Sequence, residues 1–531
     1  MKLAPRKFSS AHFQKILLLF ASILAGPIFA AAPPGSDLFT TGAVLRLQIT
    51  ISPEGFASLR TNTRKHVSAG LREGTNMFRQ VGLHLKGSTG SFRPLDDKPA
   101  LTLSFDQFEP ATRFHGLRRI HLNNSVEDPS YLNEWLGGEI FRAAGVPAPR
   151  VTHALVELNG RRLGLYVVKE GFTEDFLALH FRQTSGNLYD TGAGHDVDEA
   201  LEKDLGANPK DRSDLDALTA AARESDLVAR WTHLQRTLDT DRFVTFMALE
   251  IVLGHRDGYC LARNNFRLYH NPESDRLVFI PHGMDQLFGN PRAPLIPQMN
   301  GLVARAVMET PEGRRAYRAR VQFLMTNVIQ LAVLHQRVDA MLAALRPALE
   351  RKEARTLEQA VATLHERMDE RLHTVARQLG EPPLERLRFE NESAPLPLSL
   401  WQKMDVPVGG SLVTTHAPDG RGALVINAGP VTSASWRCRV RLAPGRYQFE
   451  GEVSTAGVGA LNFGKNHGAT LRVGPAARAL PLLGNHPWTM RRVPWEVQGT
   501  EQEIELICEL RGRRGTAWFA VESLRLVRLL P

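Results

Sequence analysis

The sequence predicts an α+β protein in which a mixed region of strands and helices comes first, a helical region follows, and an all-β region ends the chain. Three patterns carry this prediction. Apolar and polar residues alternate over 81–86 and 100–105, as in half-buried strands. Apolar residues recur at helical spacing over 312–378. After Trp401, short alternating runs separated by turn residues continue to the C-terminus.

The composition is ordinary for a globular protein. The chain has 531 residues, of which 43% are apolar and 23% charged, and these values exclude a disordered, collagen-like or multi-span membrane chain. The length predicts roughly two or three domains. Lys and Arg outnumber Asp and Glu by 65 to 56, but the basic residues form no run typical of a nucleic-acid arm, so we predict no nucleic-acid partner.

The N-terminus indicates export. Basic residues precede an apolar run from Ile16 to Ala25, and Gly26-Pro27 and a stretch of small residues follow it. This pattern predicts a signal peptide over residues 1–32 that is removed after export. We therefore expect a periplasmic, cell-surface or secreted protein with no transmembrane segment after cleavage, because the apolar run is too short to span a bilayer.

Two elements of the mixed region have clear end signals. A helix is predicted from Asp128-Pro129 to Ala144, with Gly145 closing it. A hairpin is predicted over 154–168, around the turn dipeptide Asn159-Gly160.

The helical region is expected to complete a domain over residues 39–380. Asp239 is the predicted cap of a helix that ends at Leu253, and the long helical pattern breaks at Pro347. Residues 381–398 are rich in Pro and Glu and predict a linker.

Residues 399–531 are predicted to form a jelly-roll sandwich similar to carbohydrate-binding modules. Alternate residues from Trp436 to Leu442 and from Ile504 to Leu510 are apolar, as on the inner faces of two strands. Cys438 and Cys508 would both point inward, either as a disulfide or as buried thiols.

Polysaccharide is the partner considered for this sandwich. Trp488 and Trp495 could form a platform for a sugar ring, although tryptophans in small sandwiches more often belong to the core.

The stretch from His255 to Phe288 holds the most informative polar residues, since the chain has no Walker A loop, GxSxG elbow or HExxH motif. Strands over 265–269 and 276–280 predict an antiparallel hairpin in which Asn265 lies opposite Ile280.

This hairpin would place Asn264 and Asn265 beside the loop that carries Asp285, and Asp257 would enter from the preceding helix. Carboxylate and amide oxygens suit Mg²⁺ with phosphates as its other ligands. The alternative is that the two aspartates satisfy turns and the asparagines cap the hairpin.

A phosphate site also needs a cation, and lysines are scarce in this part of the chain. Lys86 begins the loop Lys86-Gly-Ser-Thr-Gly-Ser-Phe92, Lys98 precedes a strand, and Lys169-Glu170 ends another. Each of the three is by itself more typical of a solvated strand end than of a ligand.

The motifs then follow one another in a recognisable series. They are Lys86-Gly-Ser-x-Gly-Ser-Phe-Arg, Lys98-Pro-Ala-Leu-Thr-Leu, Leu122-Asn-Asn, Asp128-Pro-Ser-Tyr-Leu, Gly145-Val-Pro-Ala-Pro-Arg, Gly186-Asn-Leu-Tyr, and Asp257-Gly-Tyr with Asn264-Asn265. From about Val44 to Leu379 the chain resembles the CotH family of secreted atypical protein kinases, which is named for a spore-coat protein.

The resemblance implies a divergent two-lobed kinase fold that uses ATP and Mg²⁺ or Mn²⁺ to phosphorylate Ser or Thr of extracytoplasmic proteins. It implies that Asp257 is the catalytic carboxylate that receives the proton of the acceptor hydroxyl. It also implies that Asn265 (or Asn264) and Asp285 are the metal ligands.

The same resemblance assigns the nucleotide phosphates to a lysine. Lys98 is the first candidate and Lys86 the second, and Glu170 is expected to orient the lysine.

One departure from the family pattern weakens the case for catalysis. Many members have Pro-Trp-Asp-x-Asp where this chain has Pro281-His-Gly-Met-Asp285, so Gly283 replaces the first aspartate. Two alternatives therefore stand beside the kinase. One is a catalytically inactive envelope or coat protein with the kinase fold and an adhesive sandwich, and the other is a different nucleotide-dependent transfer such as adenylylation.

Overall fold

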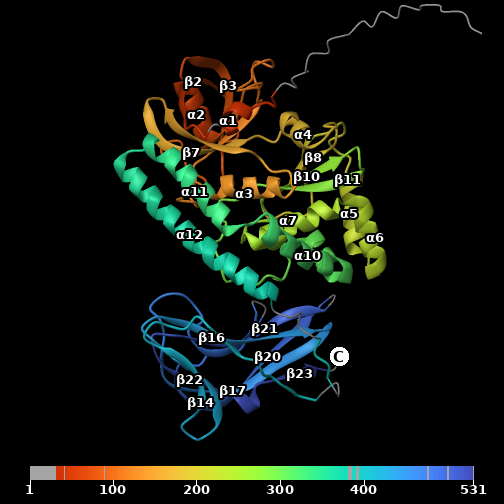
Figure 1. Cartoon of the computed structure of the whole chain (residues 1–531), viewed down its shortest axis with the longest axis vertical. Helices are drawn as coiled ribbons and strands as arrows, with labels where there is room; N and C mark the ends of the chain where they lie inside the picture. Colours follow the sequence, from red (N-terminus) through yellow and green to blue (C-terminus); the bar gives the residue numbers. More distant parts are fainter. Residues whose placement is uncertain are drawn as a thin grey trace, which may run out of the picture.

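The computed structural model describes residues 32–40, 42–88, 90–380, 386–389, 394–474, 477–498 and 501–529. A barrel, a helical part and a sandwich of two sheets follow one another along the long axis of the molecule (Figure 1). The predicted order of a mixed, a helical and an all-β region is therefore confirmed. Except for Ala32, the predicted signal peptide lies outside the described residues.

The barrel closes because the parallel pairing of its first strand with β6 joins the two ends of an otherwise antiparallel sheet. Its strands, in the order in which they pair, are β1 (Leu45–Ile51), β2 (Val67–Glu73), β3 (Asn76–Lys86), β4 (Ala100–Ser104), β5 (Arg119–Asn123), β7 (Arg161–Glu170) and β6 (Val151–Leu158). The short helices α1 (Ser36–Thr40) and α2 (Pro53–Thr61) contact β6 and β2. Asn159 and Gly160 join β6 to β7 with positive φ, so the predicted hairpin is confirmed.

The strand register sorts polar and apolar residues onto the two faces of the barrel wall. One row across β3, β4, β5 and β7 is apolar and buried in the barrel core: Leu85, Leu101, Leu122 and Val168. The next row is polar: His84, Thr102, His121 and Lys169. Because side chains alternate along a strand, this polar row lies on the outside of the barrel.

The helical part contains a small sheet with the strand order β11-β10-β8-β9 and a layer of helices. Its strands are β8 (Leu188–Asp190), β9 (Glu202–Leu205), β10 (Phe266–Asn271) and β11 (Arg276–Pro281). Its helices are α3 (Asn133–Ala143), α4 (Glu174–His180), α5 (Ser213–Arg223), α6 (Leu227–Thr237), α7 (Thr240–Val252), α8 (Tyr259–Ala262), α9 (Leu302–Glu309), α10 (Pro311–Asn327), α11 (Leu331–Leu345) and α12 (Arg351–Gly380), with a 3₁₀ turn η1 (Arg346–Ala348). The predicted cap of α7 is confirmed, since the Asp239 side chain accepts a hydrogen bond from Arg242 N. The predicted break at Pro347 is confirmed as well.

α3 begins later than the sequence predicted. Its first residue is Asn133, whereas the prediction placed the cap at Asp128. The Asp128 carboxylate binds the backbone N–H of Ser130 at 3.0 Å, which forms a turn, and also that of Asn133 at 2.9 Å. Asp128 therefore still satisfies the start of the helix, but from across an intervening turn.

The register of the β10–β11 hairpin differs from the prediction by two residues. Arg267, and not Asn265, lies opposite Ile280. Asn265 instead accepts a backbone hydrogen bond from His282 N at 3.0 Å, beyond the end of the ladder. The pairing is fixed by the tight turn between Asn271 and Arg276, which brings Asn265 closer to Asp285 than the predicted register did.

The C-terminal sandwich packs two sheets around one apolar core. The larger sheet contains β12 (Leu396–Pro397), β23 (Arg525–Leu529), β17 (Gly445–Gly459), β22 (Arg514–Ala520), β15 (Gly422–Asn427) and β14 (Ser411–His416), with β20 (Gly484–Val497) on β17. The other contains β13 (Gln402–Met404), β16 (Thr432–Leu442), β21 (Gln502–Gly512), β18 (Gly468–Val473) and β19 (Ala477–Arg478). β12 lies within the stretch expected to be a linker.

The cysteines and tryptophans of the sandwich occupy separate positions. Cys438 and Cys508 are buried free thiols, each opposite a residue other than the second cysteine in the β16–β21 ladder. Trp495 packs with Tyr447 in the core, whereas Trp488 belongs to a separate small cluster. The two tryptophans do not form the platform that the sequence suggested, because an odd spacing of seven residues along β20 puts them on opposite faces.

α12 ties the three parts together. It runs from the barrel to the sandwich (Figure 1), with Glu353 bound to Arg162 of β7 near its start. Near its end, Arg292 binds both Glu370 of α12 at 2.5 Å and Asp405 of the sandwich at 2.8 Å. Within the described residues no single helix is long and apolar enough to cross a membrane; a bent pair, Pro311–Asn327 with Leu331–Ala348, passes by length and composition only.

Arg371 anchors α12 to the rest of the helical part. Its guanidinium is fully buried and donates to Ile251 O at 2.6 Å and Val252 O at 3.0 Å, at the end of α7, and to Ala293 O at 2.5 Å. Arg371→Ala removes these three hydrogen bonds and opens a cavity, so we expect the free energy of unfolding to fall by ~3 kcal/mol. Denaturant titration measures the loss. Arg367→Ala, an exposed change on the same helix, is expected to cost less than ~0.5 kcal/mol; equal losses would contradict the anchoring role.

Candidate functional site

A buried carboxylate fixes the loop that carries Asp257. Glu250, in the last turn of α7, accepts backbone hydrogen bonds from Tyr259 N at 2.9 Å and Cys260 N at 2.8 Å. A side chain at position 258 would place its Cβ 2.4 Å from Glu250 Oε1, so only glycine fits there. The loop is therefore folded back against the end of its own helix.

His255 joins this loop to the next one. Its Nδ1 lies 3.7 Å from Glu250 Oε1, and its Nε2 donates to Gly283 O at 3.2 Å. Burial lowers the pKa of His255, but hydrogen bonding to Glu250 and the charge of that carboxylate outweigh burial and raise the pKa above its usual value. His255 thus links α7 to the loop that carries Asp285.

Both predicted asparagines bind Asp257. Asn264 Nδ2 donates to Asp257 Oδ2 at 3.0 Å, and Asn265 Nδ2 donates to the same oxygen at 2.8 Å. Because the Nδ2 groups of both asparagines donate to Asp257 Oδ2, their side-chain oxygens point away from this carboxylate. The Asn265 oxygen lies beside Gly283, where an added Cβ would be 2.3 Å from it.

The loop that carries Asp285 is held by a second buried carboxylate. Glu134, in the first turn of α3, accepts from Gly283 N and Met284 N, each at 3.0 Å. Asn133 Nδ2 donates to Asp285 O at 2.9 Å. Gly283 has φ +60°, a left-handed conformation that favours glycine. The first turn of α3 therefore sets the path of this loop.

Glu134 also binds Lys169. The Lys169 Nζ lies 3.2 Å from Glu134 Oε1, and both side chains are only 4% exposed. Such a pair gains little net stability, because each charge loses its hydration. The pair instead fixes positions, because the Glu134 carboxylate connects β7 of the barrel to the loop that carries Asp285.

Lys86 enters the same cluster from the end of β3. Its Nζ donates to Asn123 Oδ1 at 2.6 Å. Burial, the largest cause, and the nearby charge of Lys169 together lower the pKa of Lys86 to about 7, although the charges of Glu134 and Asp285 oppose this change. Two lysines thus share one site and repel each other there, an arrangement that an anionic ligand would relieve.

The surroundings of Asp285 disfavour the charged form of its carboxylate. Burial, the largest cause, and the charges of Glu134 and Glu127 together raise its pKa to about 7, although the charges of His255 and Lys169 oppose this change. A bound cation would offset that desolvation. The oxygens of Asp285 and Asn265 are hard donors that fit Mg²⁺ or Mn²⁺ with phosphate oxygens as further ligands. Among the described residues, no three His, Cys, Asp or Glu side chains are arranged to hold a metal without such additional ligands.

Two of the predicted site residues lie elsewhere. Lys98 Nζ donates to Tyr131 OH at 2.6 Å and lies over the rings of Tyr131 and Tyr166. Glu170 accepts from Arg150 Nε at 3.0 Å and Nη2 at 2.5 Å. Glu170 is thus paired with Arg150 and not with Lys98, the lysine that the sequence analysis expected it to orient. Since Glu170 follows Lys169 along β7, the two side chains point to opposite faces of the strand.

The structure brings together the other predicted residues with partners that the sequence analysis missed. Asn264 and Asn265 are both hydrogen-bonded to Asp257, and Lys86 and Asp285 share one electrostatic cluster. The missed partners are Glu134, Lys169 as its ion-pair partner, and Glu250. One signal was available: Gly137, inside a predicted helix, marks a close approach, since a Cβ there would lie 2.8 Å from Met284 Sδ.

Comparison with known proteins identifies the region that holds this site. The model of the family described as CotH kinase protein matches residues 83–380, which is more than half of the chain. The chain is 23% identical over 273 residues to the inner spore coat protein H of Bacillus subtilis, an alignment that covers 47% of this chain and 73% of that protein.

Solved structures give weaker likenesses. The Helicobacter pylori proinflammatory kinase CtkA aligns over 53% of this chain and 94% of its own, at 10% identity and a TM-score of 0.27. TmCBM61 in complex with beta-1,4-galactotriose aligns over 25% of this chain and 91% of its own, at 14% identity and a TM-score of 0.19. TM-scores this low do not establish a shared fold.

The raised pKa of Asp285 predicts a pH-dependent stability in metal-free protein. Folded Asp285 holds a proton up to about pH 7, whereas the unfolded side chain releases it near the usual pKa of 3.8, so folding stability falls as pH rises between these values. Asp285→Asn removes this titration. We expect the variant to gain at least ~1 kcal/mol over the parent between pH 5 and pH 8, measured by denaturant unfolding with a chelator present. The same difference at both pH values would contradict the burial of this carboxylate.

Proposed function

The chain belongs to the CotH kinase family, and from this premise we propose that it is an exported protein kinase that moves the γ-phosphoryl group of ATP to Ser or Thr of extracytoplasmic proteins. The observation that carries the proposal is the Glu134 carboxylate, which binds Lys169 on one side and the backbone of Gly283 and Met284 on the other. A phosphate-binding cation and the loop of a metal-binding carboxylate are thereby held at a fixed separation.

In this proposal Lys169 and Lys86 bind the nucleotide phosphates. Both point from the outer face of the barrel wall into the cluster that contains Asp285. Their mutual repulsion and the lowered pKa of Lys86 favour a multiply charged anion between them, because a bound triphosphate restores the charge balance. Lys169 takes the role that the sequence analysis gave to Lys98.

Asp285 and Asn265 would hold Mg²⁺ or Mn²⁺ together with phosphate oxygens. When bound, the ion neutralises charge on the phosphates during transfer. This chain prepares the two donors from its own backbone: Glu134 and His255 fix the Asp285 loop, and Asp257 orients the Asn265 amide so that its oxygen points away from the carboxylate.

Asp257 would act as the general base. Its Oδ2 accepts from both asparagines, and within the described residues no hydrogen bond to Oδ1 is found, which leaves that oxygen for an acceptor hydroxyl. The Ser or Thr oxygen forms a bond to the γ-phosphorus, the bond from that phosphorus to the β–γ bridging oxygen breaks, and ADP leaves. The hydroxyl proton passes to Asp257.

Export and the partners complete the proposal. The charged and apolar pattern of residues 1–32 supports export, and the related Bacillus subtilis protein is named an inner spore coat protein. A polysaccharide ligand for the sandwich stays a prediction. Of the two tryptophans considered for sugar binding, Trp488 is the one outside the main core, where its ring packs under Arg421 and its Nε1 donates to Asp419.

One observation favours the alternative of an inactive coat or envelope protein. At position 283, where many family members have aspartate, this chain has a glycine packed against Asn265. A site with one carboxylate in this loop has lost a ligand that a second metal ion would use. The kinase proposal therefore requires that one ion, with the two lysines, is sufficient.

Labelled ATP tests the proposal directly. We expect purified protein with Mg²⁺ or Mn²⁺ to transfer label from γ-labelled but not α-labelled ATP to itself or to a generic Ser/Thr protein. Lys169→Met removes the cation held by Glu134 and should lower the rate at least ~100-fold. Lys98→Met is the matched control, and should change the rate less than about threefold because Lys98 contacts Tyr131 instead.

The outcomes separate the three hypotheses. Loss of activity in Lys98→Met with retention in Lys169→Met would contradict the assignment of the phosphate site. Label from α-labelled ATP would favour adenylylation. No transfer, together with no nucleotide-induced change in melting temperature, would favour the inactive scaffold.

Gly283→Asp gives a second and less obvious prediction. The change restores the aspartate of the family pattern, yet it puts a side chain 2.3 Å from Asn265 Oδ1 and at φ +60°. We expect phosphoryl transfer to fall at least tenfold because Asn265 is displaced. Rates measured beside the parent protein check this, and an unchanged or increased rate would contradict the packing of these two loops.

A further inference from the structure

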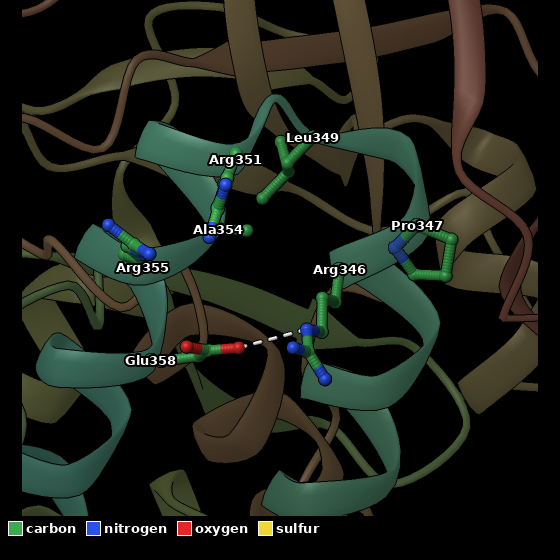
Figure 2. Close-up of a pocket in the computed structure, with 7 residues that line it drawn as sticks. All are labelled: Arg346, Pro347, Leu349, Arg351, Ala354, Arg355 and Glu358. Carbon is green, nitrogen blue, oxygen red and sulfur yellow. Dashed lines mark ion pairs between the residues drawn. The ribbon is translucent and has the colours of Figure 1, made fainter.

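A basic pocket lies at the turn between α11 and α12. Figure 2 shows it where η1 gives way to the first turns of α12. Its volume is about 620 Å³, within the range of small-molecule sites. The residues that line it are Arg346, Pro347, Leu349, Arg351, Ala354, Arg355 and Glu358.

The charges of this pocket do not balance. Glu358, its single acidic lining residue, is bound to Arg346 at 2.9 Å. Arg351 and Arg355 have no hydrogen-bond or ion-pair partner within the described residues. The nearby carboxylate of Glu353 is turned away and bound to Arg162 at 2.6 Å. Two guanidinium groups therefore face the pocket uncompensated.

The positions of these two arginines are unfavourable for the helix that carries them. Arg351 and Arg355 stand one turn apart on the same side of α12, where like charges repel. Both lie in the first two turns, where the helix dipole disfavours cations. An anion in the pocket would relieve both effects, and the apolar lining of Leu349 and Ala354 would strengthen its attraction to the guanidinium groups.

We propose that this pocket binds a small phosphate-bearing anion, either a phosphate monoester or a pyrophosphate. Guanidinium groups bind phosphate oxygens in pairs, which gives them a preference for this chemistry. The site is separate from the Lys169 cluster and does not depend on phosphotransfer. It adjoins β7 through Arg162, which binds Glu350 and Glu353 at the start of α12.

Titration calorimetry of the full chain with inorganic pyrophosphate tests the proposal. We expect binding that Arg351→Ala/Arg355→Ala weakens at least tenfold. Arg367→Ala removes an exposed arginine further along the same helix, and should leave the affinity unchanged. All three arginines are exposed, so without ligand no variant should melt at a lower temperature than the parent protein, which shows that the variants are folded.

Pyrophosphate could also enter the Lys169 cluster, and Lys169→Met separates the two sites. Binding that persists in Lys169→Met and is lost in Arg351→Ala/Arg355→Ala supports the pocket, whether or not the protein is an active kinase. Phosphoserine in place of pyrophosphate distinguishes a monoester from an anhydride as the preferred ligand. Absence of binding to the parent protein, equal binding by the double variant, or sulfate binding as tight as that of both phosphate probes would overturn the proposal.

Discussion

The arrangement of the site depends on one buried carboxylate. Glu134 accepts from Lys169 of the barrel and from two backbone N–H groups of the loop before Asp285. A buried negative charge is unfavourable without such donors, so these three contacts compensate for the burial of the carboxylate. The first turn of α3 is thus one of the points at which the barrel and the helical part are fixed relative to each other, beside the ion pair of Arg162 with α12.

A second buried carboxylate fixes a loop within the helical part by accepting hydrogen bonds from its backbone. Glu250 holds the Asp257 loop by its backbone, and His255 extends this hold to Gly283 O. Two buried glutamates, one on α3 and one on α7, therefore fix the two loops. Asp257 and Asp285, the side chains to which the proposed function gives chemical roles, do not themselves hold the backbone of these two loops. Positioning of this kind, rather than covalent chemistry by the protein, accounts for most of the rate in phosphoryl transfer.

The sequence predicted the elements that local chemistry decides. The turn at Asn159-Gly160, the cap at Asp239 and the break at Pro347 are each set by residues within a few positions. It also predicted that Asp257, Asn264 and Asn265 meet, because they lie at the two ends of one short segment. It failed where the partner is remote: Lys169 and Lys98 are both strand-end lysines, and only the barrel register decides which one faces Glu134.

The most direct test of the account is the position of a bound cation. Crystals grown with Mn²⁺ and a non-hydrolysable ATP analogue would locate the ion by its anomalous scattering. The account predicts Mn²⁺ bonded to Asp285 and Asn265 at ~2.2 Å, with Lys169 on a phosphate and still paired with Glu134. An ion held away from both residues, or carboxyl groups of Asp257 and Asp285 that face separate surfaces, would contradict it.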